Sequence, residues 1–152
     1  MFKSIATQSF IRTLLMMILL TGSAQAADRV NTSFFGNVAI KGYDPVAYFT
    51  QNAPVKGDKQ YTYEWMDANW QFASQENLET FKADPEAYAP QYGGYCAWAV
   101  ANNKLANIDP EQFTIYNDKL YLNYNADVAK KWRADKDSFI TQANANWPSV
   151  TE

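Results

Sequence analysis

Histidine is absent from the 152-residue sequence, and cysteine occurs once, as Cys96. A Cys/His zinc site needs three or four such ligands, so one chain cannot supply it. The same shortage excludes iron–sulfur clusters, His-ligated haem and blue copper. Ser-His-Asp and Cys-His catalysis lack their base, and a single thiol cannot form an intramolecular disulfide. Composition therefore removes most familiar enzyme classes without naming a function.

Charge of either sign forms no long run in the sequence. The chain has 13 basic and 16 acidic side chains, and two of the basic ones, Lys3 and Arg12, fall within the first 26 residues. This acidic balance argues against nucleic acid and against anionic membrane surfaces as partners. With 47% hydrophobic and 16% aromatic residues, the chain has enough apolar material for a core, which excludes a disordered protein.

Residues 1–26 are typical of a cleavable signal peptide. Lys3 and Arg12 precede an apolar run at 14–20, and Ala24-Gln25-Ala26 fits the small-x-small cleavage pattern. The apolar run is shorter than the roughly 20 residues that a membrane-spanning helix needs. The sequence has no cysteine near Ala26 to which a lipid anchor could be attached. We expect cleavage after Ala26 and a periplasmic protein with no membrane association after cleavage. A retained anchor is the alternative.

Residues 27–152 contain no linker or low-complexity stretch, so we expect one small α+β domain of antiparallel hairpins with packed helices. We expect residues 27–37 to be a loosely held segment before the first element of the domain, and we call this segment the lead-in. Alternating aromatic and β-branched residues predict a hairpin at 61–72 and another at 113–122.

Helices are expected after each hairpin. Ser74 is a suitable cap for the first helix, and Asp84-Pro85 predicts a short second helix that starts afresh. Asn125 is expected to cap the last helix, which Pro148 should end. Its apolar stripe comprises Val128, Trp132, Phe139 and Ala143.

The two hairpin–helix units resemble each other weakly. Residues 81–84 match residues 132–135 at an offset of 51, whereas the hairpins agree only after a shift of one residue. Because any two amphipathic helices share one hydrophobic pattern, the sequence leaves open whether the units are distant copies.

Three stretches carry a family resemblance: residues 40–49, 92–97 and 119–125. Together with Phe81, Pro85 and Tyr88, they resemble the YHS domain and, more closely, the family of exported YHS-domain (seleno)proteins over residues 38–148. The resemblance implies a YHS-like fold for the domain at 27–152. Metal-handling YHS domains carry cysteines at the positions of Ala47, Ala73 and Asn77, so the resemblance implies no metal site and no cofactor here.

Some members of the closer family are selenoproteins, and Cys96 is the only position in this sequence that could correspond to selenocysteine. The resemblance therefore implies redox or electrophile chemistry, with Cys96 as the catalytic residue and an external thiol or a small molecule as its partner. We expect binding residues around it: Tyr92, Gly93, Gly94 and Tyr95 shape the approach, and Trp98 shields the thiol. No second cysteine is present to resolve an oxidised sulfur.

The local structure at Cys96 allows two interpretations. Three alanines in residues 95–101 favour a helix that Asn102 and Asn103 end, with Cys96 in its first turn, where backbone N–H groups stabilise a thiolate. The alternative is a strand that buries Cys96, Trp98 and Val100 on one face. Free cysteine is also commonly a buried small hydrophobe, and the sequence leaves the two roles open.

A different class of function also fits the sequence. Ten tyrosines and five tryptophans could give a non-catalytic module that binds a small ligand, such as a sugar or an aromatic molecule, or a partner. Metal binding by carboxylates is the weakest alternative, because no Asp-x-Asp-x-Asp-Gly loop is present. Whether the protein is an enzyme, and its oligomeric state, stay undecided at this point.

Overall fold

The computed structural model describes residues 28–152, and its strands form two antiparallel hairpins. β1 (Asp58–Trp65) pairs with β2 (Ala68–Phe72), and β3 (Asp109–Tyr116) pairs with β4 (Lys119–Asn123). Both two-residue turns have positive φ at each position, which suits the right-handed twist of the strands. Both predicted hairpins and the α+β class are confirmed, although β1 and β3 begin three and four residues before the predicted starts.

Six α-helices and two short 3₁₀ segments complete the described part of the chain. Side-chain oxygens of Asp44, Ser74, Asp84 and Asn125 accept backbone N–H groups at four of the helix starts, which confirms the three caps that the sequence predicted. The segments are η1 (Ile40–Gly42), α1 (Pro45–Thr50), α2 (Gln75–Ala83), α3 (Pro85–Tyr88), η2 (Gln91–Gly94), α4 (Ala97–Ala101), α5 (Ala126–Ala134) and α6 (Lys136–Val150).

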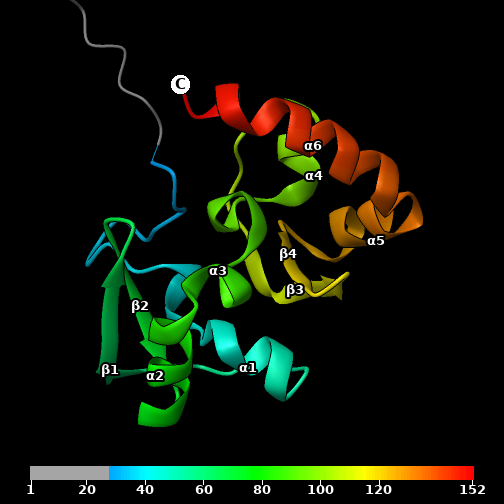
Figure 1. Ribbon diagram of the computed structural model, residues 1–152. Helices are drawn as coiled ribbons and strands as arrows, with labels where there is room; N and C mark the ends of the chain where they lie inside the picture. The colour runs from blue at the N-terminus through cyan, green and yellow to red at the C-terminus, as the bar shows by residue number, and fades with distance from the viewer. Residues whose placement is uncertain (1–27) are drawn as a thin grey trace, which may run out of the picture.

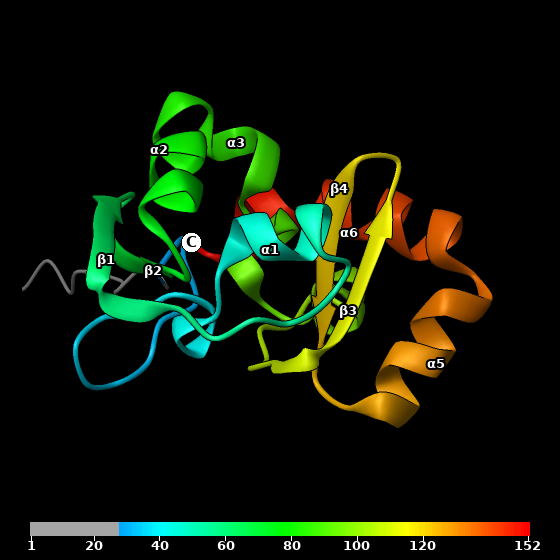
Figure 2. The ribbon, with the colours of Figure 1, turned by 90° about the horizontal axis from the view of Figure 1, so that it is seen from below.

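The elements are arranged as two halves that lie side by side (Figure 1). One half holds the β1–β2 hairpin with α2, and the other holds the β3–β4 hairpin with α5 and α6. The view from below shows the same division, with α1 between the two hairpins (Figure 2).

The second half repeats the first. β3, β4 and α5 begin at 109, 119 and 126, each 51 residues after β1, β2 and α2 at 58, 68 and 75. The register irregularity falls between Asp58 and Thr62 in one hairpin and between Asp109 and Phe113 in the other, again 51 residues apart. The hairpins thus match without the shift that the sequence required. The one-residue shift lies upstream, where Gly42 (φ +82°) corresponds to Gly94 (φ +80°).

The core consists of two aromatic clusters, one in each half. In the first, the ring of Phe81 lies 5.2 Å from the rings of Trp70 and Phe72. In the second, the rings of Tyr121 and Trp132 lie 4.9 Å apart. Phe81 and Trp132 are fully buried, so each half buries a large apolar side chain of its first helix against its own hairpin.

The expected last helix is two helices, α5 and α6, because Asp135 leaves the helical region (φ −147°, ψ 51°). Two residues of the predicted apolar stripe, Trp132 on α5 and Ala143 on α6, are buried as expected. The helix does not end at Pro148, since α6 continues to Val150. α6 is held on α4 by Asn146, whose Nδ2 donates to the carbonyls of Val100 (3.0 Å) and Ala101 (3.1 Å).

The lead-in is bound to the fold, contrary to the expectation of a loose segment. Val30 is buried in the core, and the N–H of Asn31 donates to the carbonyl of Gly93 at 2.8 Å. The hydroxyl of Tyr95 donates to the carbonyl of Asp28 at 2.9 Å. The predicted signal peptide at 1–26 lies outside the described residues and stays a prediction.

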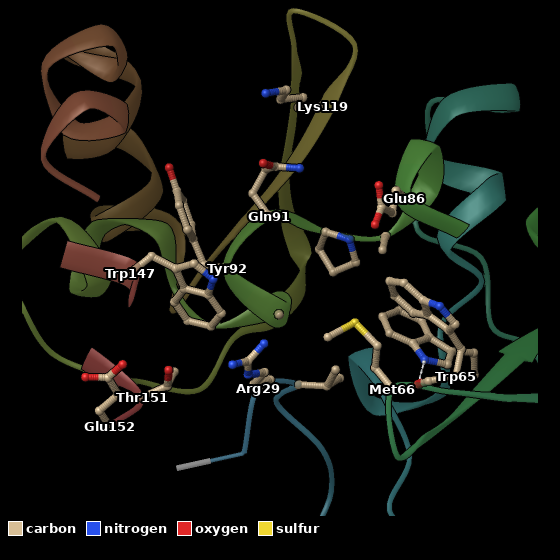
Figure 3. Close-up of a pocket in the computed structure, with 15 residues that line it drawn as sticks. Arg29, Trp65, Met66, Glu86, Gln91, Tyr92, Lys119, Trp147, Thr151 and Glu152 are labelled. Atoms are coloured by element: carbon tan, nitrogen blue, oxygen red, sulfur yellow. Dashed lines mark hydrogen bonds between the residues drawn. The ribbon is translucent and has the colours of Figure 1, made fainter. Parts of the chain in front are cut away.

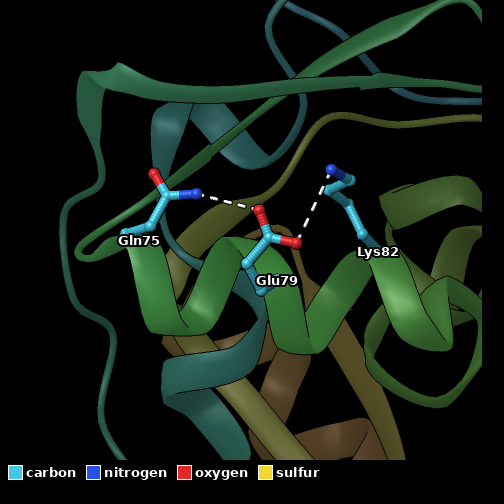
Figure 4. A network of polar contacts seen from close by, with 3 residues as sticks. All are labelled: Gln75, Glu79 and Lys82. Atoms are coloured by element: carbon cyan, nitrogen blue, oxygen red, sulfur yellow. Dashed lines mark hydrogen bonds and ion pairs between the residues drawn. The ribbon is translucent and has the colours of Figure 1, made fainter.

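The exposed face of α2 carries a small polar network (Figure 4). Gln75 Nε2 donates to Glu79 Oε1 at 2.8 Å, and Glu79 Oε2 lies 3.6 Å from Lys82 Nζ. These i, i+3 and i, i+4 contacts belong to a solvated helix surface and add only tenths of a kcal/mol to the stability.

Among the described residues, no helix combines the length and the apolar character needed to cross a membrane.

Candidate functional site

A cavity of about 660 Å³ lies at the junction of the two halves and is called the aromatic cleft here. Its volume falls within the range of small-molecule sites, roughly 300–1,000 Å³. Residues from the lead-in, the β1–β2 turn, the α3–η2 segment, the start of β4 and the end of α6 line it. They include Arg29, Val30, Trp65, Met66, Trp70, Glu86, Ala89, Pro90, Gln91, Tyr92, Gly93, Lys119, Trp147, Thr151 and Glu152.

Two pairs of aromatic rings form facing walls of the aromatic cleft (Figure 3). Trp65 and Trp70 lie 5.7 Å apart, and Trp70 Nε1 donates to the carbonyl of Trp65 at 2.9 Å. Tyr92 and Trp147 lie 5.9 Å apart on the other side. The Tyr92 hydroxyl donates to Asn144 Oδ1 at 2.9 Å, and burial raises the pKa of Tyr92, so this hydroxyl stays neutral. Each wall therefore contains one ring that a hydrogen bond holds in place, Trp70 on one side and Tyr92 on the other.

The aromatic cleft also contains four charged side chains: Arg29, Lys119, Glu86 and Glu152. Within residues 28–152, the one ion pair joins Glu79 and Lys82 on α2, so the four charges of the cleft have no ionic partner there. Figure 3 shows Arg29 between the two aromatic walls, with Lys119 and Glu86 at another side of the cleft. The cleft can therefore offer both a cation and an anion to a ligand.

The predicted site residues divide between two places. Tyr92 and Gly93 line the aromatic cleft, whereas Gly94, Tyr95, Cys96 and Trp98 do not. The Gly-Gly-Tyr segment mainly holds the lead-in: a Cβ on Gly93 would lie 1.8 Å from the carbonyl oxygen of Arg29. Gly93 also has φ +59°, a region that favours glycine. These residues thus position the cleft wall that Arg29 and Val30 supply.

Cys96 is the residue immediately before α4, so the helix interpretation is confirmed but the thiol precedes the first turn. Only 1% of Cys96 is exposed, and its Sγ donates to Asn123 Oδ1 at 3.6 Å. Burial raises the pKa of the Cys96 thiol, although backbone N–H groups of Ala99, Tyr124 and Trp98 act in the opposite direction. The thiol is therefore neutral near pH 7.

Asp44 occupies a second buried polar site at the start of α1. Its Oδ1 accepts the N–H groups of Val46 (2.8 Å) and Ala47 (3.2 Å). Its Oδ2 accepts the N–H of Ala73 (2.8 Å) and the Nδ2 of Asn77 (2.7 Å). These four donors are called the Asp44 cradle here. A fully buried carboxylate is stable only with such a complete set of donors.

Ala47, Ala73 and Asn77, the positions at which the resemblance implies cysteines in metal-handling YHS domains, all belong to the Asp44 cradle. Ala47, Ala73 and Asn77 contact the carboxylate through a backbone N–H or a side-chain amide, and none of them is a metal ligand. Across residues 28–152, no three His, Cys, Asp or Glu side chains gather in a way that could hold a metal ion.

Sequence reasoning missed most of the aromatic cleft. Arg29 and Trp147 lie near opposite ends of the described chain, and no spacing rule connects them. A partial signal was present in Trp65 and Trp70, which flank one tight turn and share a hairpin end. Their position at one hairpin end gave no opposite wall.

Comparison with known proteins gives one family. Residues 46–92 match the family model of the YHS domain. The match covers α1, the first hairpin, α2, α3 and the start of η2, and it ends before Cys96. The search of curated proteins and the search of solved structures gave no match.

Proposed function

Because the chain carries a YHS domain in residues 46–92, we propose that the protein is a non-catalytic binding module built around this domain. The observation that carries the proposal is the aromatic cleft, which the domain forms together with the lead-in and α6. A preformed, aromatic-walled cavity with a few polar groups is the usual form of a small-molecule site.

The lining of the aromatic cleft indicates the chemistry of its ligand. Trp65 and Trp147 offer half-buried ring faces, which suit the flat face of an aromatic ring or a sugar. Arg29 and Glu86 can pair with charged groups at the ends of such a ligand, since neither has an ionic partner among the described residues. The proposed ligand is a small ring-bearing molecule with polar or charged ends.

Thermal melting of the protein with four probes tests this proposal: benzoate, phenethylamine, phenylalanine and maltose. These are an anionic, a cationic and a zwitterionic aromatic molecule, and a neutral sugar. A ligand at 100 times its Kd adds about 2.7 kcal/mol to the unfolding free energy, so at least one probe should raise the melting midpoint. Trp147→Ala should abolish that rise by removing one wall of the cleft.

Tyr124→Ala is the matched control, since Tyr124 is 55% exposed and does not line the cleft. A shift that survives in Trp147→Ala, or that disappears in both variants, would place binding elsewhere. If none of the four probes moves the midpoint at millimolar concentration, the binding-module proposal fails.

A second candidate function is thiol redox or electrophile chemistry at Cys96, with an external thiol as the reductant. One observation favours it: Cys96 stands at the start of α4, where the backbone N–H groups of Trp98, Ala99 and Tyr124 oppose the effect of burial on the pKa of its thiol. Such donors stabilise a thiolate once it forms. The thiol would then react through brief local opening of the fold.

Labelling of Cys96 by iodoacetamide checks this candidate. We expect slow labelling in the native protein at a rate that low urea does not change, since local opening exposes little surface. If the labelling rate instead rises with urea as steeply as global unfolding does, labelling requires complete unfolding. That result would contradict the candidate and leave Cys96 a structural residue. Labelling of Cys96 in the fully unfolded protein gives the reference rate.

The raised pKa of Cys96 also predicts a loss of stability at alkaline pH. Because the thiol pKa is higher in the folded than in the unfolded state, the folded protein retains this proton longer. The neutral thiol's contribution is complete below the unfolded pKa, about 8.5, and falls as pH rises above it. The difference in unfolding free energy between the wild type and Cys96→Ala should therefore shrink between pH 7 and a pH of about 9.5. An unchanged difference would contradict the raised pKa.

A further inference from the structure

The backbone at Cys96 repeats the backbone at Asp44. The torsion angles agree, with φ −76° and ψ 114° at Asp44, and φ −58° and ψ 115° at Cys96. Each residue also donates its backbone N–H to a carbonyl in the loop before the next hairpin. The N–H of Asp44 donates to the carbonyl of Val55 (2.8 Å), and that of Cys96 donates to the carbonyl of Ala106 (3.0 Å). Cys96 thus stands in the second half where a carboxylate stands in the first.

The donors around the two side chains correspond as well. In the Asp44 cradle, N–H groups come from the second and third residues after Asp44 and from the first residue after β2. At Cys96 the backbone groups that lower the thiol pKa stand at the same places, namely Trp98 and Ala99, the second and third residues after it, and Tyr124, the first residue after β4. The N–H of Trp98 donates to Asn123 Oδ1 while the occupant is a thiol. Together with Asn123, these groups are called the Cys96 cradle here.

A buried amide in the Cys96 cradle lacks an acceptor. Asn123 is fully buried, and its side chain faces the thiol, with Oδ1 3.6 Å from Sγ and 3.2 Å from the N–H of Trp98. Its Nδ2 has no hydrogen-bond partner. In the first half, by contrast, the Nδ2 of Asn77 donates to Asp44 at 2.7 Å. A thiol is a poor acceptor, so the second cradle holds more donors than its occupant can use.

We propose that Cys96 is an oxidation site for hydrogen peroxide and that its stable product is the sulfinate, which the Cys96 cradle holds as the first cradle holds a carboxylate. This inference rests on the second candidate function. In the first step the sulfur attacks the peroxide O–O bond and forms a sulfenic acid with release of water. A second peroxide converts it to the sulfinic acid with release of another water, and the acid gives its proton to solvent. Each step oxidises sulfur by two electrons and reduces one peroxide.

A sulfinate suits this cradle because it resembles a carboxylate: one negative charge is shared by two oxygens on one atom. One oxygen can accept from Trp98 and Ala99, as Oδ1 of Asp44 accepts from two N–H groups. The other can accept from Tyr124, as Oδ2 of Asp44 accepts from Ala73. A half-turn of the Asn123 amide would give its Nδ2 an acceptor as well.

Three substitutions at Cys96 separate an anion cradle from an ordinary apolar pocket. Cys96→Asp places a carboxylate at the sulfur, Cys96→Asn is its neutral counterpart, and Cys96→Ala removes the polar atom. The cradle predicts a melting midpoint for Cys96→Asp at or above those of both other variants. An apolar pocket would make Cys96→Asp the least stable of the three, and that order would overturn the inference.

Treatment of the full chain with hydrogen peroxide, followed by intact-mass measurement and peptide mapping, tests the oxidation itself. We expect two oxygen atoms on Cys96 in the folded protein and a melting midpoint no lower than before treatment. Met66, which is 45% exposed, reports how far the peroxide has reacted. If Met66 is oxidised while Cys96 stays a thiol, the inference fails. If iodoacetamide labels Cys96 but peroxide gives no sulfinate, the second candidate function stands without it.

Discussion

Replacing Asp44 by alanine is expected to lower the unfolding free energy by about 4 kcal/mol, because four donors, two buried and two partly buried, lose their acceptor. Three of these donors are backbone N–H groups, which no change of rotamer can redirect. The carboxylate also joins α1 to α2 through Ala73 and Asn77, so its loss separates two elements as well as uncapping one. A drop in the melting midpoint of more than about 10 °C should follow.

Asp84→Ala is the matched control for this variant. Asp84 also caps a helix, but it is exposed and accepts only one N–H, from Ala87 at 3.3 Å. Its replacement should cost about 1 kcal/mol, as the loss of an ordinary cap does. Equal losses in the two variants, measured by urea unfolding, would show that the Asp44 cradle adds nothing beyond a cap.

The Asp44 cradle ties together α1, the end of β2 and α2, within the part of the chain that matches the YHS family model. The carboxylate of Asp44 joins these elements through hydrogen bonds to Ala47, Ala73 and Asn77. Ala47, Ala73 and Asn77 therefore each have a structural role as a hydrogen-bond donor to Asp44.

Local patterns in the sequence were sufficient for the hairpins and for most caps. Alternating aromatic residues beside two-residue turns predict strands, because both signals act over a few residues. Ser74, Asp84 and Asn125 were likewise identifiable as caps, since each accepts an N–H only three residues further on. Element type and turn position follow from such short-range physics.

Long-range contacts decided the features that the sequence did not predict. The lead-in is bound by contacts with distant residues, among them the carbonyl of Gly93, which accepts the N–H of Asn31, and the hydroxyl of Tyr95, which donates to Asp28. Opposite walls of the aromatic cleft come from Trp65 and Trp147, whose proximity depends on the packing of α6. The break at Asp135 did have a signal, because Ala134-Asp135 repeats Ala83-Asp84, where a new helix also starts.

The role of Cys96 was open in the sequence because two properties of the site oppose each other. Its neighbours predicted a helix start with N–H groups near the sulfur, and the structure has Trp98 and Ala99 there, although the N–H of Trp98 donates to Asn123 Oδ1. Burial, which depends on the surrounding second half, could not be read from those neighbours. The outcome is a buried neutral thiol in a site rich in donors, and neither property alone describes it.

Gly93→Ala is expected to lower the unfolding free energy by about 3 kcal/mol and to release the lead-in. The new Cβ would lie 1.8 Å from the carbonyl oxygen of Arg29, which is backbone and cannot rotate away. Left-handed backbone at φ +59° adds about 1 kcal/mol of strain for an L-residue. Displacement of the lead-in would then expose Val30, whose burial is worth about 2 kcal/mol.

Gly36→Ala is a control that introduces backbone strain without a steric clash. Gly36 has φ +78°, but a Cβ there would lie no closer than 3.5 Å to another atom, Val38 Cγ2. That variant should lose only about 1 kcal/mol. Hydrogen exchange should show faster exchange at Asn31 in Gly93→Ala and unchanged exchange there in Gly36→Ala. Because Arg29 and Val30 form one side of the aromatic cleft, Gly93→Ala should also weaken any probe that binds there. If the two glycine variants lose equal stability and keep Asn31 protected, the lead-in is held by contacts other than the one at Gly93.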